Sequence, residues 1–535
     1  MTQQMLMASI ILIPVIFGIL IYLLPLKMAK IVLLGVQVYL LALAVFLYLQ
    51  TGTQTEIYAI IGGDNPILNI VFRGDRFSTL LVVLTNFLFG IGFLYKLNDK
   101  FFSNKLILLY LILQGLTNGL FLSDDFFNLF ILFEVSTVIT TILLMYKRDG
   151  RVVYDALYYL ITQMVSMMFF LFGIGFLYRA FGVLSISYIA SMIQYAPASE
   201  MILPFSFLMA GLGFKLGLYP MQGWVSRAYA LNSAPITQVA VMSSIMMKTT
   251  LYWFLFFHRM FLPLFDYSLL FSFIAIVTAI YSALKALSQK DIRLMLAFST
   301  VSQIGFMLAA SLVGNVYSET GTLYHFITHA IFKMLLFLSA GLIISQYETA
   351  DIYSIRGVMK KLPFAGVMTI IGMISITGFP LTSGSVSKYF MTSGLSNIWL
   401  EIIFWIMSFG TILVFVKFST MLLPSEHEKE YSVKKIKKVA VTLLSLATLC
   451  IGALLNYGIN NILLVDFHIK LVDFITKGLI YFVLVALAII IYRKFIHSKQ
   501  YHYDKMEHSL SFSRMCLVLV AFFTVLVSYG MWVVR

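Results

Sequence analysis

Lysine residues inside apolar segments are the first sign of chemistry in this sequence. Lys215 lies in a membrane-length apolar run that begins near Met201, and Lys248 lies in the next such run. An ammonium group in the hydrocarbon of a bilayer costs roughly 2.5 to 3.5 kcal/mol even on a permissive insertion scale, so it is usually kept only where it faces a polar or wet interior. Two such lysines on successive spans predict a route for ions.

The helix that carries Lys215 is predicted to break at mid-depth. Gly211, Gly213 and Gly217 surround this lysine in the sequence, and Pro220 closes the run. Glycine weakens a helix, and proline removes a backbone donor. Because irregular backbone at membrane depth is tolerated where it lines a water-filled cavity, the break beside Lys215 indicates a transport site.

The composition places the chain in a broad class. Of its 535 residues, 61% are hydrophobic and 16% aromatic, whereas only 11% are charged. Apolar runs of about 20 residues, the length of a membrane-spanning helix, follow one another along the chain. We predict an all-α polytopic membrane protein with about 16 transmembrane helices. The predicted spans are 5–25, 30–50, 77–95, 105–122, 125–146, 156–178, 202–220, 235–257, 266–288, 292–313, 321–345, 363–392, 399–423, 439–459, 476–493 and 514–533.

The formal net charge of +14 reflects topology rather than nucleic-acid binding. Most lysines and arginines lie in short loops between spans. The loops after odd-numbered spans hold the clusters, such as Lys360 and Lys361 after the eleventh span. By the positive-inside rule these loops are cytoplasmic, which places both termini on the external side. We therefore expect a multi-pass protein of the cell membrane and no nucleic-acid partner.

Two interrupted spans indicate an internal repeat. The seventh span breaks around LGLYP after Lys215, and the twelfth breaks around TGFPLTSGS before Lys388. The span after each break carries one lysine, Lys248 and Lys417 respectively. Because the units are offset by five spans, an odd number, they run in opposite directions, an arrangement typical of transport sites. The predicted units are N-terminal helices at 1–104, a first five-helix repeat at 105–257, an inverted second five-helix repeat at 266–423 and C-terminal helices at 439–535.

Several sequence strings together resemble a known family of membrane proteins. They occur in order between residues 105 and 420, and the combination is far more specific than any one string. The chain resembles the antiporter-like subunits shared by respiratory complex I, Mrp-type cation/proton antiporters and membrane-bound hydrogenases. The run SDDFFNLFILFEV is most similar to the D-type member of Mrp antiporters. The strings are NLFILFEV around Glu134, GFKLGLYPMQGW around Lys215, MKTTLYW around Lys248, LAFSTVSQIGFM from Leu296, HFITHAIFKMLLFLSAG around Lys333 and GFPLTSGSVSKYF around Lys388.

The resemblance implies a proton path through buried residues of several spans. Glu134 on the fifth span would be the carboxylate partner of Lys215. From Lys248 the path would lead inward through the eleventh span to Lys388 on the twelfth. The implied proton-translocation residues are Glu134, Lys215, Lys248, His325, His329, Lys333, Lys388 and Lys417.

Physical chemistry makes these implied roles sensible. Burial favours the neutral form of a lysine, whereas a carboxylate within roughly 4 to 6 Å favours the charged form. Movement of Glu134 toward or away from Lys215 would therefore load or release a proton. On the eleventh span, His325, His329 and Lys333 follow one another at intervals of four residues, so they share one helical face and form a wire with water.

Each role has a simpler structural alternative. Lys215 and Lys248 could be structural cations that neutralise one buried acid. A buried histidine often only bonds a backbone carbonyl, and Lys417 could extend its ammonium to the cytoplasmic surface. Metal ligation by the histidines is disfavoured because no cysteine or carboxylate accompanies them at ligand spacing. We expect no metal and no cofactor.

The resulting prediction is a proton-translocating subunit of a multi-subunit Na⁺/proton antiporter of Mrp type. Its partners would be other membrane subunits, protons and Na⁺. The alternative is a proton-pumping membrane-arm subunit of a complex I-like NADH-quinone oxidoreductase or a membrane-bound hydrogenase. Any redox chemistry would then lie on a partner, because the sequence shows no haem, flavin, quinone or iron–sulfur motif. A purely structural scaffold is disfavoured, since it has no reason to keep several lysines at mid-depth.

Overall fold

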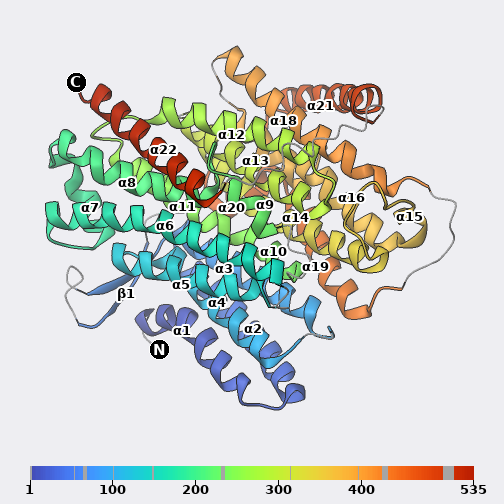
Figure 1. Cartoon of the computed structure of the whole chain (residues 1–535), viewed down its shortest axis with the longest axis horizontal. Coiled ribbons are helices and arrows are strands. Elements are labelled where there is room, and N and C mark those ends of the chain that lie inside the picture. Colours follow the sequence, from blue (N-terminus) through green and yellow to red (C-terminus); the bar gives the residue numbers. More distant parts are fainter. Residues whose placement is uncertain are drawn as a thin grey trace.

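The computed structural model is a packed assembly of membrane-length helices, shown in Figure 1. Within its described part, 15 helices are long and apolar enough to cross a membrane. This confirms the all-α polytopic class. The described residues are 3–52, 55–63, 69–99, 102–146, 150–229, 235–313, 315–393, 395, 397–424, 432–497 and 511–535.

The N-terminal part consists of three long helices and one hairpin. The polar stretch that follows the second predicted span forms two antiparallel strands, β1 and β2, which the all-α prediction missed. Asp75 begins the third helix with a capping box, in which its side chain accepts from the Ser78 amide and the Ser78 hydroxyl accepts from the Asp75 amide. The elements are α1 (Gln3–Tyr22), α2 (Leu26–Gln50), β1 (Ile57–Ile61), β2 (Ile70–Gly74) and α3 (Arg76–Lys96).

The middle of the chain holds the helices that carry most of the candidate residues. The eighth predicted span is not a regular α-helix, because a π-helical turn separates α10 from α11. The first group is α4 (Asn104–Leu122), α5 (Phe126–Leu144), α6 (Gly150–Phe181), α7 (Ile186–Met192), α8 (Ala198–Leu216), α9 (Gly223–Tyr229), α10 (Ile236–Val241), the π turn Met242–Met246 and α11 (Met247–Phe261). The second group is α12 (Ser268–Ser288), α13 (Ile292–Leu312), α14 (Val316–Tyr347), α15 (Val358–Lys361), α16 (Pro363–Thr377), α17 (Ser383–Met391) and α18 (Ile398–Ser419).

The C-terminal helices attach to separate places on this core, and α19 packs against α14, α3 and α16. The last helix, α22, packs against α8 and α6, whereas α21 packs against α18 (Figure 1). These two helices expose most of their apolar side chains, as membrane-facing or subunit-facing helices do. The elements are α19 (Lys435–Ala453), α20 (Leu455–Leu463), α21 (Leu471–Ile491), the π-helical turn Tyr492–His497 and α22 (Phe512–Val533).

Both predicted helix breaks are present. Helix α8 ends directly after Lys215 because Gly217 adopts a left-handed conformation, with φ of +69°. Helix α16 ends in the same way at Gly378, with φ of +90°. Glycine takes this conformation without a steric cost, which explains why the helices stop there. The twelfth predicted span, 363–392, is thus two short helices, and for this reason it is absent from the 15 long ones.

Contacts between loops support the alternation of the predicted spans. The Lys437 ammonium lies 2.8 Å from the Asp99 carboxylate, which joins the segments after the thirteenth and third spans. The Tyr48 hydroxyl donates to the Ile462 carbonyl at 2.9 Å, which joins the ends of the second and fourteenth spans. The first contact joins the ends of two odd-numbered spans, and the second joins the ends of two even-numbered spans. This is expected if every predicted span crosses the membrane once. The side of the membrane on which each set lies stays a prediction, as do the inverted relation of the two repeats and their boundaries.

Candidate functional site

The first candidate centre lies where α5 meets the end of α8. The Lys215 ammonium donates to the Thr137 hydroxyl at 2.8 Å and lies 5.5 Å from the centre of the Phe133 ring. Glu134 is three residues before Thr137 on α5, so both side chains lie on neighbouring positions of one helical face. One carboxylate oxygen of Glu134 is buried without a hydrogen-bond partner among the described residues. The lysine thus bonds the hydroxyl next to its predicted acidic partner.

A small cavity with a few polar side chains in its lining borders Lys215. Its volume is about 30 Å³, and a space of roughly 10 to 15 Å³ on this measure holds one water molecule. Gln163 and Tyr159 from α6 line it, and neither the oxygen nor the nitrogen of the Gln163 amide has a partner among the described residues. Trp224 on α9 closes another side and donates to the Phe214 carbonyl at 3.0 Å. The break in the helix therefore creates a site that suits water beside a lysine.

The N-terminal end of α5 is fixed by a separate polar cluster. The Ser187 hydroxyl donates to the Asp124 carboxylate at 2.6 Å, and Arg73 from the hairpin donates to that hydroxyl at 2.8 Å. Burial raises the pKa of the Asp124 carboxyl above its usual value, although the Ser187 hydrogen bonds and the Arg73 charge act in the opposite direction. Next to it, the Asp125 side chain accepts from the Asn128 amide and caps α5. These contacts hold the helix that carries Glu134.

The second candidate lysine is associated with the π turn. Lys248 is fully buried, and its ammonium donates to the Ser243 carbonyl within the turn. A π turn shifts the backbone hydrogen-bond ladder, and such turns are frequent at functional sites. The Ser243 hydroxyl also shares a hydrogen bond of 2.5 Å with the Thr300 hydroxyl of α13. The turn therefore supplies a carbonyl to a lysine and connects α11 to the most deeply buried helices.

Helix α14 places two histidines and a lysine on one face, as predicted. It is continuous over Val316–Tyr347, and the rings of His325 and His329 lie with their centres 5.7 Å apart. Both nitrogens of His329 are buried without a hydrogen-bond partner among the described residues. Further along the face, the Lys333 ammonium donates to the Leu296 carbonyl at 2.9 Å and to the Ser299 hydroxyl. His329 thus sits between two groups that already have partners.

His325 has a partner at each ring nitrogen. Its Nδ1 lies 2.8 Å from the Ser387 hydroxyl, and its Nε2 lies 3.1 Å from the Gln303 side-chain oxygen. The Gln303 amide group donates to the Thr411 hydroxyl at 2.9 Å, which fixes its orientation. The Ser387 hydroxyl also lies 3.0 Å from the Ser383 carbonyl. By rotating, this hydroxyl can donate either to Nδ1 or to the carbonyl, so both the neutral and the charged imidazole are satisfied.

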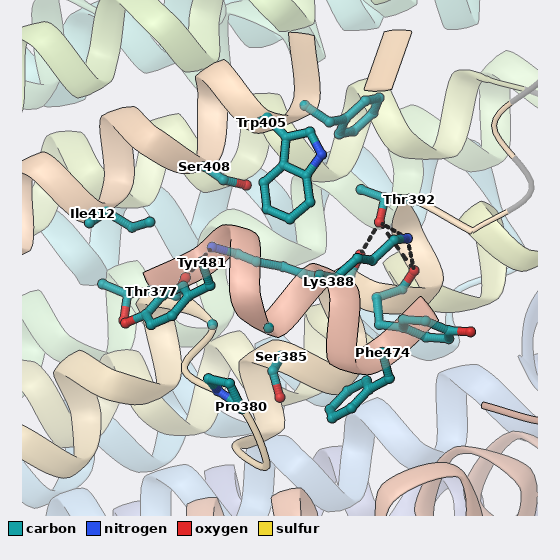
Figure 2. Close-up of a pocket in the computed structure, with 15 residues that line it drawn as sticks. Thr377, Pro380, Ser385, Lys388, Thr392, Trp405, Ser408, Ile412, Phe474 and Tyr481 are labelled. Atoms are coloured by element: carbon teal, nitrogen blue, oxygen red, sulfur yellow. Dashed lines mark hydrogen bonds between the residues drawn. The ribbon is translucent and has the colours of Figure 1, made fainter. Parts of the chain in front are cut away.

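Lys388 bridges the second helix break. Its ammonium donates to the Ile376 carbonyl at 2.9 Å and to the Thr377 carbonyl at 3.3 Å. These are the last carbonyls of α16, which lack partners within the helix and attract a cation. Figure 2 shows the side chain extended toward Thr377, with Thr392 at the other end of the same cavity. Lys388 is the residue after Ser387, so α17 carries both the partner of His325 and the lysine that binds the end of α16.

Lys417, like Lys388, contacts the carbonyls at the end of another helix. It is buried, and its ammonium donates to the Leu287 carbonyl at 2.8 Å and to the Gln289 carbonyl at 2.6 Å. These carbonyls lie at the C-terminal end of α12, where a cation stabilises the helix. The described contacts of Lys417 therefore favour the structural role that the sequence left open.

Several polar partners of the candidate lysines and histidines were not predicted. Gln303 and Ser387 lie within the quoted strings, but only the packing of α13 and α17 against α14 brings both to His325. Lys477 stands at the start of the fifteenth predicted span, where a lysine is typical of a membrane interface. In the structure its ammonium donates to the Thr392 hydroxyl at 2.6 Å, next to the Lys388 cavity. Gln303 carries a side-chain amide in a predicted span, and this is the sequence signal that points to it.

Comparison with known proteins identifies the sequence relatives of this chain. The family described as "NADH:quinone oxidoreductase/Mrp antiporter, TM" matches residues 123–416. The N-type membrane component of the NADH-quinone oxidoreductase of Desulforudis audaxviator is 30% identical over 291 residues, which cover 54% of this chain and 58% of that protein, less than two thirds of its length. The D-type component of the Na⁺/H⁺ antiporter of Bacillus subtilis is 26% identical over 343 residues, which cover 62% of this chain and 69% of that protein.

Solved structures share the fold over nearly the whole chain. A chain of the membrane-bound sulfane sulfur reductase, an archaeal respiratory membrane complex, superimposes with a TM-score of 0.80 at 21% identity, covering 90% of this chain and 100% of that one. A chain of the Mrp complex from Dietzia superimposes with a TM-score of 0.76 at 20% identity, covering 86% of this chain and 98% of that one. At this identity the likeness shows the fold alone. Both are parts of multi-subunit membrane complexes.

Proposed function

Because the chain belongs to the NADH:quinone oxidoreductase/Mrp antiporter transmembrane family, we propose that it is the D-type proton-translocating subunit of a multi-subunit Na⁺/proton antiporter. The observation that carries this proposal is the set of buried protonatable groups that extends from one helix break, at Lys215, to the other, at Lys388. Such groups are costly inside a membrane protein and mark ion pathways. The relatives that are D-type components of Na⁺/H⁺ antiporters support Na⁺ as the exchanged cation.

Proton loading is proposed to begin at the Lys215 centre. An approach of the Glu134 carboxylate to the ammonium favours the charged lysine, and a return to the Thr137 contact favours proton release. The cavity beside Lys215 reaches Met246 and Met247, at the junction of the π turn with α11. Water in this cavity is proposed to carry the proton from Lys215 toward Lys248, the residue that follows Met247 on α11.

Transfer through the centre is proposed to use the α14 face. His329 has two nitrogens available for water, and His325 accommodates either protonation state through the Ser387 hydroxyl. Two unit charges at the 5.7 Å separation of the two rings repel by about 3 kcal/mol at an effective dielectric constant of about 20. A proton that arrives at one histidine therefore drives the other to release its proton toward Lys388.

We propose that the protein lies in the cell membrane with both termini outside and works with other membrane subunits. A redox-driven membrane arm is the second candidate, because the Desulforudis audaxviator relative is a component of an NADH-quinone oxidoreductase. In that case electron transfer on a partner drives the same proton path.

The experiment that tests the proposal uses the assembled complex in sealed vesicles that contain a pH indicator. The antiporter proposal predicts that a Na⁺ gradient alone moves protons in the opposite direction. If protons move only after an electron donor is added, the antiporter proposal is wrong and the redox-driven alternative is supported. A complex that lacks this protein is the control for leakage.

A further inference from the structure

A cavity extends from Lys388 to Lys477. Its volume is about 60 Å³, so it holds several water molecules by the same measure as above. Lys388, Thr392 and Tyr481 line it, and Figure 2 shows Lys388 between Thr377 and Thr392. Lys477 from α21 also lines this cavity. Two lysines from different helices therefore line one cavity that holds several water molecules.

Lys477 closes the far end of this cavity. Its ammonium donates to the Thr392 hydroxyl at 2.6 Å and to the Tyr389 carbonyl at 3.4 Å, and lies 4.8 Å from the centre of the Tyr389 ring. These groups belong to the C-terminal end of α17, the helix that carries Lys388. Lys388 extends in the other direction, to the carbonyls of α16. Lys388, carried by α17, thus reaches the end of α16, whereas Lys477, carried by α21, binds the end of α17.

A second, larger cavity begins on the other side of Lys477. Its volume is about 360 Å³, and Tyr389, Thr392 and Lys477 line both cavities. The outer cavity is also lined by the acidic side chains of Glu401 and Asp473, and by two exposed basic residues, His468 and Lys470. Lys477 and Thr392 therefore form the partition between a narrow inner cavity and a wide polar one that reaches the surface.

We propose that Lys477 is the group through which protons pass between the Lys388 cavity and this outer cavity. The inference rests on the proposed function. A proton leaves the Lys388 ammonium for water in the inner cavity, and this water protonates the neutral Lys477 amine. The Lys477 ammonium then breaks one N–H bond to water in the outer cavity. The carboxylates of Glu401 and Asp473, which line the outer cavity, favour the positive charge on this side. Once the proton path has protonated Lys388 again, its ammonium opposes the return of the released proton.

The alternative is a purely structural role, in which Lys477 caps the end of α17. The two roles differ in one requirement. A cap needs only a positive charge that donates hydrogen bonds, whereas a relay must release its proton. Arginine supplies the first and not the second, because it stays charged at any accessible pH. Lys477→Arg therefore separates the roles.

The first measurement is Na⁺-driven proton exchange by the complex in vesicles, normalised to assembled protein. Lys477→Arg should lower the exchange rate by about a hundredfold or more, the usual contribution of a positioned proton-transfer group. Lys27→Arg, at an exposed lysine of α2, is the matched control and should exchange at the wild-type rate. Lys477→Arg with wild-type exchange would overturn the inference.

The second measurement restores the lost group chemically. Lys477→Cys is made in a background with Cys450 and Cys516 replaced by alanine, and mass spectrometry confirms modification of the new thiol. Aminoethyl methanethiosulfonate adds a protonatable amine, whereas the trimethylammonium analogue adds a permanent charge. Recovery with the amine only supports the relay. Recovery with both reagents, or with neither after complete modification, would overturn it.

These outcomes are separable from a failure of the proposed function. If the wild-type complex shows no Na⁺-driven exchange, the proposed function fails before Lys477 is tested. If the wild type exchanges and only the Lys477 results contradict the expectation, the proposed function stands and this inference alone is wrong.

Discussion

Removing the Ser387 hydroxyl tests whether His325 carries protons. In the structure this hydroxyl lies 2.8 Å from Nδ1 and 3.0 Å from the Ser383 carbonyl. Ser387→Ala leaves the charged imidazole with a buried N–H that has no acceptor. A hydrogen bond to a charged group is worth about 1.5 to 3 kcal/mol, against about 1 kcal/mol for a neutral one. The variant should thus disfavour the charged state by about 0.5 to 2 kcal/mol, which is a factor of about 2 to 30 in its population.

The assay for this variant is Na⁺-driven proton exchange per assembled complex. We expect the exchange rate to fall by about the same factor of 2 to 30 as the charged population. Ser339→Ala is the matched control, because Ser339 is also fully buried on α14 but its hydroxyl donates to the Leu336 carbonyl of its own helix. Wild-type exchange by a correctly assembled Ser387→Ala complex would refute the relay through His325.

Two further substitutions separate translocation from structure. Glu134→Gln should abolish proton exchange while the complex still assembles, because a neutral amide cannot draw a proton onto Lys215; normal exchange would disprove the pair. Lys417→Met should leave exchange near the wild-type rate and lower the melting temperature, since two buried carbonyls lose their donor, each at a cost of about 1 to 3 kcal/mol. Loss of exchange with an unchanged melting temperature would contradict this and indicate that Lys417 takes part in proton transfer.

The helix breaks were predictable because their cause is local. Glycine clusters beside Lys215 and before Lys388 mark the places where a helix must stop, and Gly217 and Gly378 adopt the left-handed conformations that stop it. The fold class was equally predictable, because a span needs only length and apolarity. These features depend on residue type and spacing within about 20 residues.

The remaining features depend on packing between distant segments. The π turn before Lys248 is a shift of backbone hydrogen bonds that no single residue type signals. The contacts of His325 require α13 and α17 to reach α14 together, and the role of Lys477 requires α21 to lie beside α17. For Lys417 the sequence leaves a transport role and a structural role open, and its contact with the end of α12 fits a helix cap.

The most direct test of the proton path replaces Lys388 by arginine. Arginine keeps the positive charge that the last carbonyls of α16 bind, but it cannot release a proton at any accessible pH. The measurement is proton flux in vesicles that contain the full complex, normalised to assembled protein, for wild type, Lys388→Ala and Lys388→Arg. The proton path predicts that both variants stop translocation. Wild-type flux in Lys388→Arg would show that this site needs only a charge, and would contradict proton transfer through Lys388.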